Sequence, residues 1–371
     1  MVNKCFFLLD SLSVGGSERK TIRAANLLVE RGMHVHIGFL NATVDLRKTI
    51  DSRIPVFSGK RKGKFDVGLL RQIRRYILEQ EIDIVWAVNL YPILYLFLAT
   101  RGMRRKVRVI GSSNITVFRN AYENRKMRLY APIIRRLDGF VFGSHQQKSL
   151  WENKYSLSGG NLSVIHNGVD TNWFSTGAPD MDRIAARNLY GFDESDIVIG
   201  MVAQFRVEKA HSDLLAACRV LDRRGIPVRL LLVGCGDEEG NIHKLAEEWE
   251  IADKVVFAGQ LEDVRPALEA MDIFALTSRA VETFSNAALE AMAMGLPAVL
   301  SDLSGASEMV SNEVNGFIYP PGDVEALTAS LERLKDKDFR QQCGRRGRGI
   351  VVERFSSSVM ADQYVRVIWG T

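Results

Sequence analysis

The sequence predicts an α/β protein of two doubly wound domains, each a parallel sheet covered by helices, with an interdomain cleft. Its 371 residues are enough for two domains of about 170 to 200 residues. Short β-rich runs alternate with helical patterns along nearly the whole chain, and a stretch rich in Asp, Gly, Pro and Asn interrupts them once. We therefore expect a first domain at 1–170, a linker at 171–195, a second domain at 196–355 and a helix at 356–371 that can pack back on the first domain.

Ten strands are expected from short runs of β-branched, aromatic and aliphatic residues. In the first domain they lie at 5–9, 34–40, 83–88, 107–112 and 139–143. In the second domain they lie at 197–203, 228–233, 254–258, 272–276 and 297–300. Because open parallel sheets bind ligands beyond the carboxyl ends of their strands, we expect the functional residues in the loops that follow these runs, facing the cleft.

Composition narrows the class of protein. With 46% hydrophobic and 25% charged residues, the chain is neither disordered nor fibrous. The longest strongly apolar stretch, 90–100, is far shorter than the roughly 20 residues that a membrane-spanning helix needs. The N-terminus lacks the layout of a signal peptide, and the four cysteines are too widely spaced to suggest a disulfide framework or a zinc knuckle. These features predict a soluble, cytoplasmic protein.

Charge is divided unevenly along the chain. Residues 1–170 hold 28 Lys and Arg against 13 Asp and Glu, a net +15, whereas the remainder holds 21 against 31, a net −10. A basic half favours a polyanionic partner, such as an anionic membrane or a phosphate-bearing substrate. The basic helical pattern at 119–136 is compatible with a lipid-facing helix and equally with a core-facing helix that has a solvated basic back. No aromatic-rich motif accompanies these charges, so nucleic acid is not expected.

Two local patterns suggest where anions and hydroxyls bind. A Gly15-Gly16 turn opens the first helical pattern, where backbone N–H groups can approach an anion, although it can equally be only a tight turn. Glu282 and Glu290 stand eight residues apart, which on a continuous helix separates their backbones by about 12 Å. That spacing suits two carboxylates that hold opposite ends of an extended ligand.

Several motifs in order along the chain resemble the retaining glycosyltransferases of family 4, which have the GT-B fold of two Rossmann-like domains. The matching pieces are Gly15-Gly16-Ser17-Glu18, Val164-Ile165-His166-Asn167-Gly168-Val169-Asp170, Lys209, Leu232-Val233-Gly234-Cys235-Gly236, the Glu282-x7-Glu290 pair, Asn315-Gly316-Phe317 and Pro321-Gly322-Asp323. The resemblance covers essentially the whole chain. It implies that the second domain binds most of a nucleotide-sugar donor and that the first domain binds the acceptor.

The resemblance also implies roles for individual residues. Glu290 would hydrogen-bond the ribose hydroxyls of the donor, and Glu282, as a catalytic residue, would hold hydroxyls of the transferred sugar near the reacting carbon. The donor site would further include Gly15, Gly16, Leu261 and the segment Thr283, Phe284, Ser285 and Asn286 at a helix N-terminus.

The chain departs from the family pattern at two catalytic positions. Where relatives commonly carry an arginine, this chain has Gln204; Lys209 is present, and Arg206 is a candidate for the missing charge on the leaving diphosphate, or else a surface arginine. Where many relatives place a histidine in the first domain, this chain has Asn114. An asparagine can bind a sugar hydroxyl but cannot accept its proton, which suits a mechanism in which the departing phosphate accepts it; an ordinary loop role is the alternative.

No metal or other cofactor is expected. Asp180-x-Asp182 has the spelling of a metal-binding motif of another glycosyltransferase class, but it lies in the expected linker without a preceding strand. The six histidines show no ligand spacing on a helix; His34 and His36 share one strand face, where a structural role is favoured.

These features predict a retaining hexosyl- or N-acetylhexosaminyltransferase that moves a sugar from a nucleoside diphosphate, UDP by preference, to a glycan or glycolipid acceptor. The product would belong to polysaccharide, lipopolysaccharide or lipid-linked oligosaccharide biosynthesis. The enzyme would be cytoplasmic and attached peripherally to the inner face of the cell membrane. The alternatives are a non-catalytic GT-B scaffold and a nucleotide-sugar epimerase.

Overall fold

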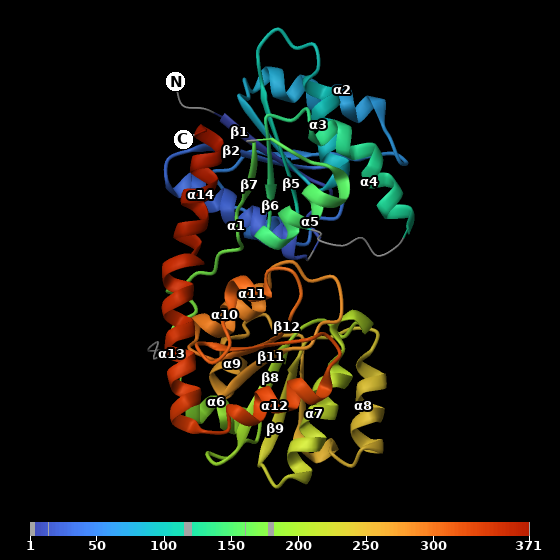
Figure 1. Cartoon of the computed structure of the whole chain (residues 1–371). Helices are drawn as coiled ribbons and strands as arrows, with labels where there is room; N and C mark the ends of the chain where they lie inside the picture. The colour runs from blue at the N-terminus through green and yellow to red at the C-terminus, as the bar shows by residue number, and fades with distance from the viewer. Residues whose placement is uncertain (1–3, 14, 115–120, 160, 177–181, 371) are drawn as a thin grey trace. The chain divides into compact units, whose positions relative to one another are not determined.

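The chain divides into two compact units, each built around its own parallel sheet (Figure 1). A computed structural model describes residues 4–13, 15–114, 121–159, 161–176 and 182–370, without the side chains of 121–126. The first unit comprises Met1–Gly168 and Ser357–Thr371, and the second comprises Val169–Ser356. The two units are therefore joined by two chain crossings.

In the first unit, the described residues form a seven-stranded sheet in the order β3-β2-β1-β4-β5-β6-β7. The strands are β1 Lys4–Leu9, β2 His34–Phe39, β3 Val56–Ser58, β4 Ile84–Val88, β5 Arg108–Ser113, β6 Gly139–Phe142 and β7 Leu162–Val164. The helices are α1 Gly16–Glu30, the short 3-10 helix η1 Arg47–Thr49, α2 Val67–Glu79, α3 Leu90–Thr100, α4 Ala121–Ile134, α5 His145–Tyr155 and α14 Ser357–Trp369. Helices cover both faces of the sheet (Figure 1).

Strand β1 shows why these runs become central strands. Phe6 and Leu8 face a core shared with α2 and α3, whereas Phe7 and its alternate neighbours face a second core with α1 and α14. Since both faces are buried, the strand is a continuous apolar run. Tyr364 of α14 packs 4.8 Å from the ring of Trp86, so the C-terminal helix completes the first unit's core.

In the second unit, the described residues form a six-stranded sheet in the order β10-β9-β8-β11-β12-β13. The strands are β8 Ile197–Val202, β9 Val228–Val233, β10 Val255–Gly259, β11 Ile273–Leu276, β12 Ala298–Ser301 and β13 Gly316–Tyr319. The helices are α6 Arg183–Leu189, η2 Val207–Lys209, α7 His211–Arg223, α8 Glu239–Glu248, η3 Ala252–Lys254, α9 Arg265–Ala270, α10 Asn286–Ala293, α11 Ala306–Met309, α12 Val324–Arg333 and α13 Lys337–Arg354.

The segment expected as a linker belongs to the second unit. Arg183 and Arg187 of α6 bind the Asp272 carboxylate at 2.8 and 3.1 Å, and Arg340 of α13 lies 3.5 Å from it. Asp272 also accepts the backbone N–H of Val198 at 2.9 Å. One carboxylate, whose side chain is only 11% exposed, thus ties α6 and α13 to the start of β11, so this segment does not act as a free connection. Residues 177–181, with Asp180 of the Asp-x-Asp spelling, lie outside the described residues, and Asp182 caps α6.

All ten expected strands are present, and the described residues contain three more, β3, β7 and β13. Each of the three occupies a sheet edge and is only three or four residues long. Among the described residues, no helix combines the length and apolar character needed to cross a bilayer.

Candidate active site

In the second unit, the central pair β8 and β11 forms the point where the strand order reverses. After β8 the chain passes through residues 203–210 into α7 and on to β9, whereas after β11 it passes through residues 277–285 into α10 and on to β12. The two loops therefore start from neighbouring strand ends and lead to helices that continue in opposite directions along the sheet. Such a switch point is where doubly wound sheets bind ligands.

Lys209 and Glu282 meet at this point from the two loops. The Lys209 ammonium lies 2.6 Å from a Glu282 carboxylate oxygen, and both side chains are about four-fifths buried, with exposed fractions of 20% and 16%. Ser278 lies 3.2 Å from the same carboxylate oxygen. The Thr277 hydroxyl lies 3.0 Å from the carbonyl oxygens of both Lys209 and Ala210, which locks the first loop to the second.

The loop that carries Glu282 is held by a second ion pair. Arg279 donates two hydrogen bonds to the buried Asp213 carboxylate, at 2.9 and 2.6 Å, and its backbone N–H donates to the Glu208 backbone carbonyl at 2.8 Å. Val281 adopts a φ of 57°, a conformation that costs a β-branched residue free energy. The surrounding contacts therefore impose a strained backbone directly before Glu282.

Glu282 and Glu290 do not share a helix. α10 begins at Asn286, and the Ser285 hydroxyl caps it by accepting the Ala288 N–H at 3.2 Å. Glu282 lies in the preceding loop, whereas Glu290 lies on α10, half-buried. The 12 Å spacing expected for a continuous helix therefore does not apply, because the cap places the start of the helix after Glu282.

In the segment 283–286, the Phe284 side chain is turned into the core, so a ligand would contact backbone groups instead. The ring of Phe284 is buried and packs 5.2 Å from the ring of Phe355. The Thr283 carbonyl accepts the Gly305 N–H at 2.9 Å. A ligand at this end of α10 would meet backbone groups and the polar side chains of the segment.

Two more expected site residues follow β8 and β10. Arg206 is exposed, and its carbonyl accepts the Lys209 N–H at 2.9 Å, so it stands at the start of η2. Leu261 follows β10 and is half-buried. Between these strands, Gly234 and Gly236 have φ of 143° and 154°, and a Cβ on them would lie 2.0 and 2.4 Å from carbonyl oxygens of the loop after β8. Only glycine permits this close approach of the two loops.

His211 begins α7 beside Lys209. Its ring stacks on Phe205 with centroids 4.2 Å apart and planes 10° apart. Burial, and secondarily the charge of Lys209, lower the pKa of His211 to about 4. The ring is therefore neutral near pH 7 and adds no second positive charge beside Lys209.

In the first unit, the expected donor-site turn faces a carboxylate of its own helix. Gly15 is the extended residue before α1, and a Cβ on it would lie 2.3 Å from a Glu18 carboxylate oxygen. Burial raises the pKa of Glu18. An anion at the Gly15-Gly16 turn would have to displace this carboxylate. The structure therefore gives less support to the prediction that the turn binds an anion. Asn114 is half-buried directly after β5, and residues 115–120 lie outside the described part of the chain.

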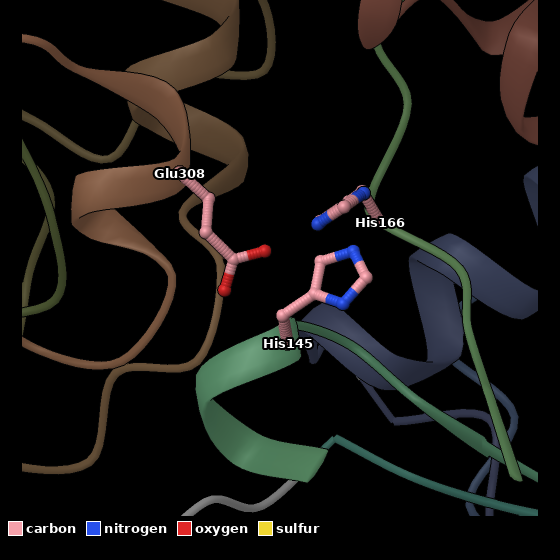
Figure 2. A group of neighbouring side chains, drawn as sticks. All are labelled: His145, His166 and Glu308. Carbon is pink, nitrogen blue, oxygen red and sulfur yellow. The ribbon is translucent and has the colours of Figure 1, made fainter. Parts of the chain in front are cut away.

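The sequence patterns do not predict the proximity of one pair of histidines. His145 and His166 of the first unit lie side by side, with ring centroids 5.5 Å apart (Figure 2). Their sequence separation gives no helical or strand spacing. The available signal is positional, because each histidine follows the end of one of two neighbouring strands, β6 and β7.

Two family profiles match the chain in succession. The profile described as Glycosyltransferase Family 4 matches residues 14–173, and the profile described as Glycosyl transferases group 1 matches residues 182–349. Together they span most of both units. The chain belongs to the GT-B glycosyltransferases of family 4.

Individual relatives of this glycosyltransferase agree with the family. It is 24% identical over 370 residues to the N-acetyl-alpha-D-glucosaminyl L-malate synthase of Bacillus anthracis, covering 96% of this chain and 94% of the relative. It is 33% identical over 142 residues to the lipopolysaccharide core biosynthesis glycosyltransferase LpsE of Rhizobium meliloti, covering 38% of this chain and 42% of the relative. The crystal structure of Anabaena HepE in complex with UDP superposes with a TM-score of 0.88 at 21% identity, covering 99% of this chain and 100% of that chain. The expected GT-B fold is confirmed.

Replacing His211 tests the electrostatics of the loop that carries Lys209. The folded-state pKa of His211 lies near 4 and the unfolded-state value near 6.5. The contribution of His211 to the free energy of unfolding is therefore fully present above pH 6.5 and is lost progressively as the pH falls towards 4. We expect His211→Phe, which keeps the stacking on Phe205, to remove about 2 kcal/mol of the stability difference between pH 7 and pH 5. Urea-induced unfolding at the two pH values measures this difference.

The matched control is His243→Phe, a change at an exposed histidine that stacks on Phe257. The control should keep the pH dependence of the natural chain. An unchanged pH dependence in His211→Phe would show that His211 is not the buried neutral group described above.

Proposed function

We propose that the protein is a retaining glycosyltransferase that moves a sugar from a UDP-sugar donor to a glycan or glycolipid acceptor. The observation that carries the proposal is the Lys209–Glu282 pair at the switch point of the second sheet, with Glu290 on the adjoining helix α10. A cation, two carboxylates and a helix N-terminus match the diphosphate and the two hydroxyl-bearing ends of a nucleotide sugar.

In this proposal each group has one task. Lys209, with Arg206 beside it in the same loop, stabilises the charge that develops on the leaving diphosphate. Glu282 accepts hydrogen bonds from hydroxyls of the transferred sugar, and Glu290 accepts them from the ribose. The transfer then obtains its cationic stabilisation from side chains, without a metal ion or another cofactor.

Retention of configuration follows from where the proton goes. Asn114, the polar side chain after β5 in the first unit, can orient an acceptor hydroxyl but cannot take its proton. The departing phosphate oxygen is then the base, so that attack and departure occur on the same face of the sugar. The residue types at these positions support this route.

The donor nucleotide and the type of product are proposed from relatives. HepE has been crystallised with UDP and with UDP-glucose, while a Corynebacterium glutamicum relative is named a GDP-mannose-dependent mannosyltransferase. Names of other relatives refer to lipopolysaccharide core and capsular polysaccharide biosynthesis. We take UDP as the donor nucleotide and a surface or lipid-linked glycan as the product.

A membrane-borne acceptor agrees with the charge of the first unit. Residues 1–170 carry a net +15, and α4 exposes Arg128 beside Leu129, whose exposed fraction is 74%. Arg136, two residues after the end of α4, is also exposed. Basic groups that flank an exposed apolar side chain favour peripheral binding to anionic lipid.

Separate changes at the two glutamates test the donor site. Glu290→Ala should raise the Kd for UDP about 10- to 100-fold, because it removes charged hydrogen bonds to the ribose. Glu282→Ala should lower kcat about 100-fold or more and change the UDP affinity much less, because its partner is the transferred sugar. Calorimetry with UDP and sugar transfer from a panel of UDP-sugars measure both effects.

Glu247→Ala on α8, a change at an exposed glutamate of the same unit, is the control and should alter neither quantity. Equal, small effects at Glu282 and Glu290 would contradict the assigned roles. Binding of UDP without transfer to any acceptor would favour a non-catalytic scaffold.

Liposome flotation tests the membrane surface. The double change Arg128→Glu and Arg136→Glu should weaken binding to anionic vesicles about 30-fold, at about 1 kcal/mol for each basic residue lost. The control double change Arg223→Glu and Lys244→Glu, at exposed residues of the second unit, should leave it unaffected. Binding that does not depend on anionic lipid would sink this part of the proposal.

A further inference from the structure

His145 and His166 are brought together by the pairing of β6 with β7. Phe142 of β6 pairs with Val164 of β7, so that the two parallel strands end side by side. His145 is the first residue of α5, three positions after Phe142, and His166 stands two positions after Val164. One ring nitrogen of each histidine lies within 4.8 Å of one of the other. Figure 2 shows the two rings together; Glu308, also labelled there, belongs to the second unit.

Helix α1 holds the backbone on both sides of His166. The buried Lys20 ammonium donates a hydrogen bond to the Ile165 carbonyl at 2.7 Å, and Arg23 donates one to the Gly168 carbonyl at 2.8 Å. The segment that carries His166 is therefore fixed to the first unit rather than left as a surface loop.

The backbone of His145 is held equally firmly. The Ser144 hydroxyl caps α5 by accepting the backbone N–H of Gln147 at 3.1 Å, and the side-chain amide oxygen of Gln147 accepts the backbone N–H of Gly143 at 2.7 Å. Lys148 on the first turn donates to the Leu162 carbonyl of β7 at 3.1 Å, which ties α5 to the neighbouring strand. Two rigid backbones thus present two imidazoles to the same point, as a preorganised ligand site requires.

We propose that His145 and His166 form a site for a divalent transition-metal ion of the zinc type. Imidazole nitrogens suit Zn²⁺, Ni²⁺ and Cu²⁺ rather than Mg²⁺ or Ca²⁺, which prefer oxygen ligands. Zinc–nitrogen bonds of about 2.0–2.1 Å at a near-tetrahedral angle require the two nitrogens to lie about 3.3 Å apart. Metal binding therefore requires the two nitrogens, which lie within 4.8 Å of each other, to approach, and the His145 side chain that must move is exposed.

The site is open rather than structural. Two protein ligands leave coordination positions for water or for an oxygen of a bound molecule. The positive end of α5 opposes a cation, so the affinity is lower than at a closed four-ligand site. The site uses none of the residues assigned to transfer, and its existence does not depend on the proposed function.

Zinc titration of the full, tag-free chain tests the proposal. The exposed thiol of Cys235 is itself a zinc ligand, so all variants are made in a Cys235→Ser background, in which the remaining cysteines are buried. Calorimetry should give one Zn²⁺ per chain. His145→Asn and His166→Asn should each weaken binding about tenfold or more. His34→Asn, at an exposed histidine of β2, should leave the affinity unchanged.

Nitrogen-15 NMR of histidine-labelled protein supplies a second readout. Zinc should shift the imidazole signals of two histidines, and each signal should disappear in the corresponding variant. Unchanged zinc affinity in both variants, shifts at other histidines, or no binding of zinc by the background protein would each overturn the site.

UDP binding, measured on the same variants, separates this inference from the proposed function. UDP affinity should be the same in the background protein and in both histidine variants, which also reports that they are folded. Absence of UDP binding by the natural chain, measured alongside, would count against the donor site and leave the zinc result standing.

Discussion

The pairing of β8 with β11 is the constraint on which the rest of the second unit depends. These strands are neighbours in the sheet but are separated in the chain by β9, β10 and their helices. Because they are parallel, both end at the same edge, and the loops after them diverge to opposite sides. Lys209 and Glu282 reach each other only because of this arrangement, at 2.6 Å. Any change that separated the two strands would move Lys209 and Glu282 apart, even if every residue of the candidate site were kept.

Under the proposed function, the Lys209–Glu282 ion pair would also set the energetics of donor binding. Two charges that are each about four-fifths buried cost less free energy when they compensate each other than either would cost alone. In the proposed function, a diphosphate that binds Lys209 would replace one anion with another, and the released Glu282 carboxylate would accept hydrogen bonds from sugar hydroxyls. The contacts from Thr277 and Arg279 hold both loops in position during this exchange, since they do not involve the exchanged groups.

Much of this could be predicted from the sequence, and the failures have identifiable physical causes. The long central strands are continuous apolar runs because both faces of each strand are buried, and such runs are visible in the sequence. The sequence does not predict β3, β7 and β13, because three or four residues at a sheet edge are too few to show a run of β-branched, aromatic and aliphatic residues. The sequence places the N-terminus of α10 within residues 283–286, and the structure agrees because Ser285 caps the helix that begins at Asn286; the spacing of about 12 Å would hold only if the helix also included Glu282. The linker and the His145–His166 pair depend on contacts across the fold, with Asp272 and β7, which no local pattern reports.

The most direct test of the central claim is a crystal structure of the full chain with UDP bound. The diphosphate should contact the Lys209 ammonium at the ends of β8 and β11, with Glu282 displaced from its 2.6 Å contact and the ribose hydroxyls on Glu290. UDP bound elsewhere, or bound while the Lys209–Glu282 pair remains intact, would contradict the account.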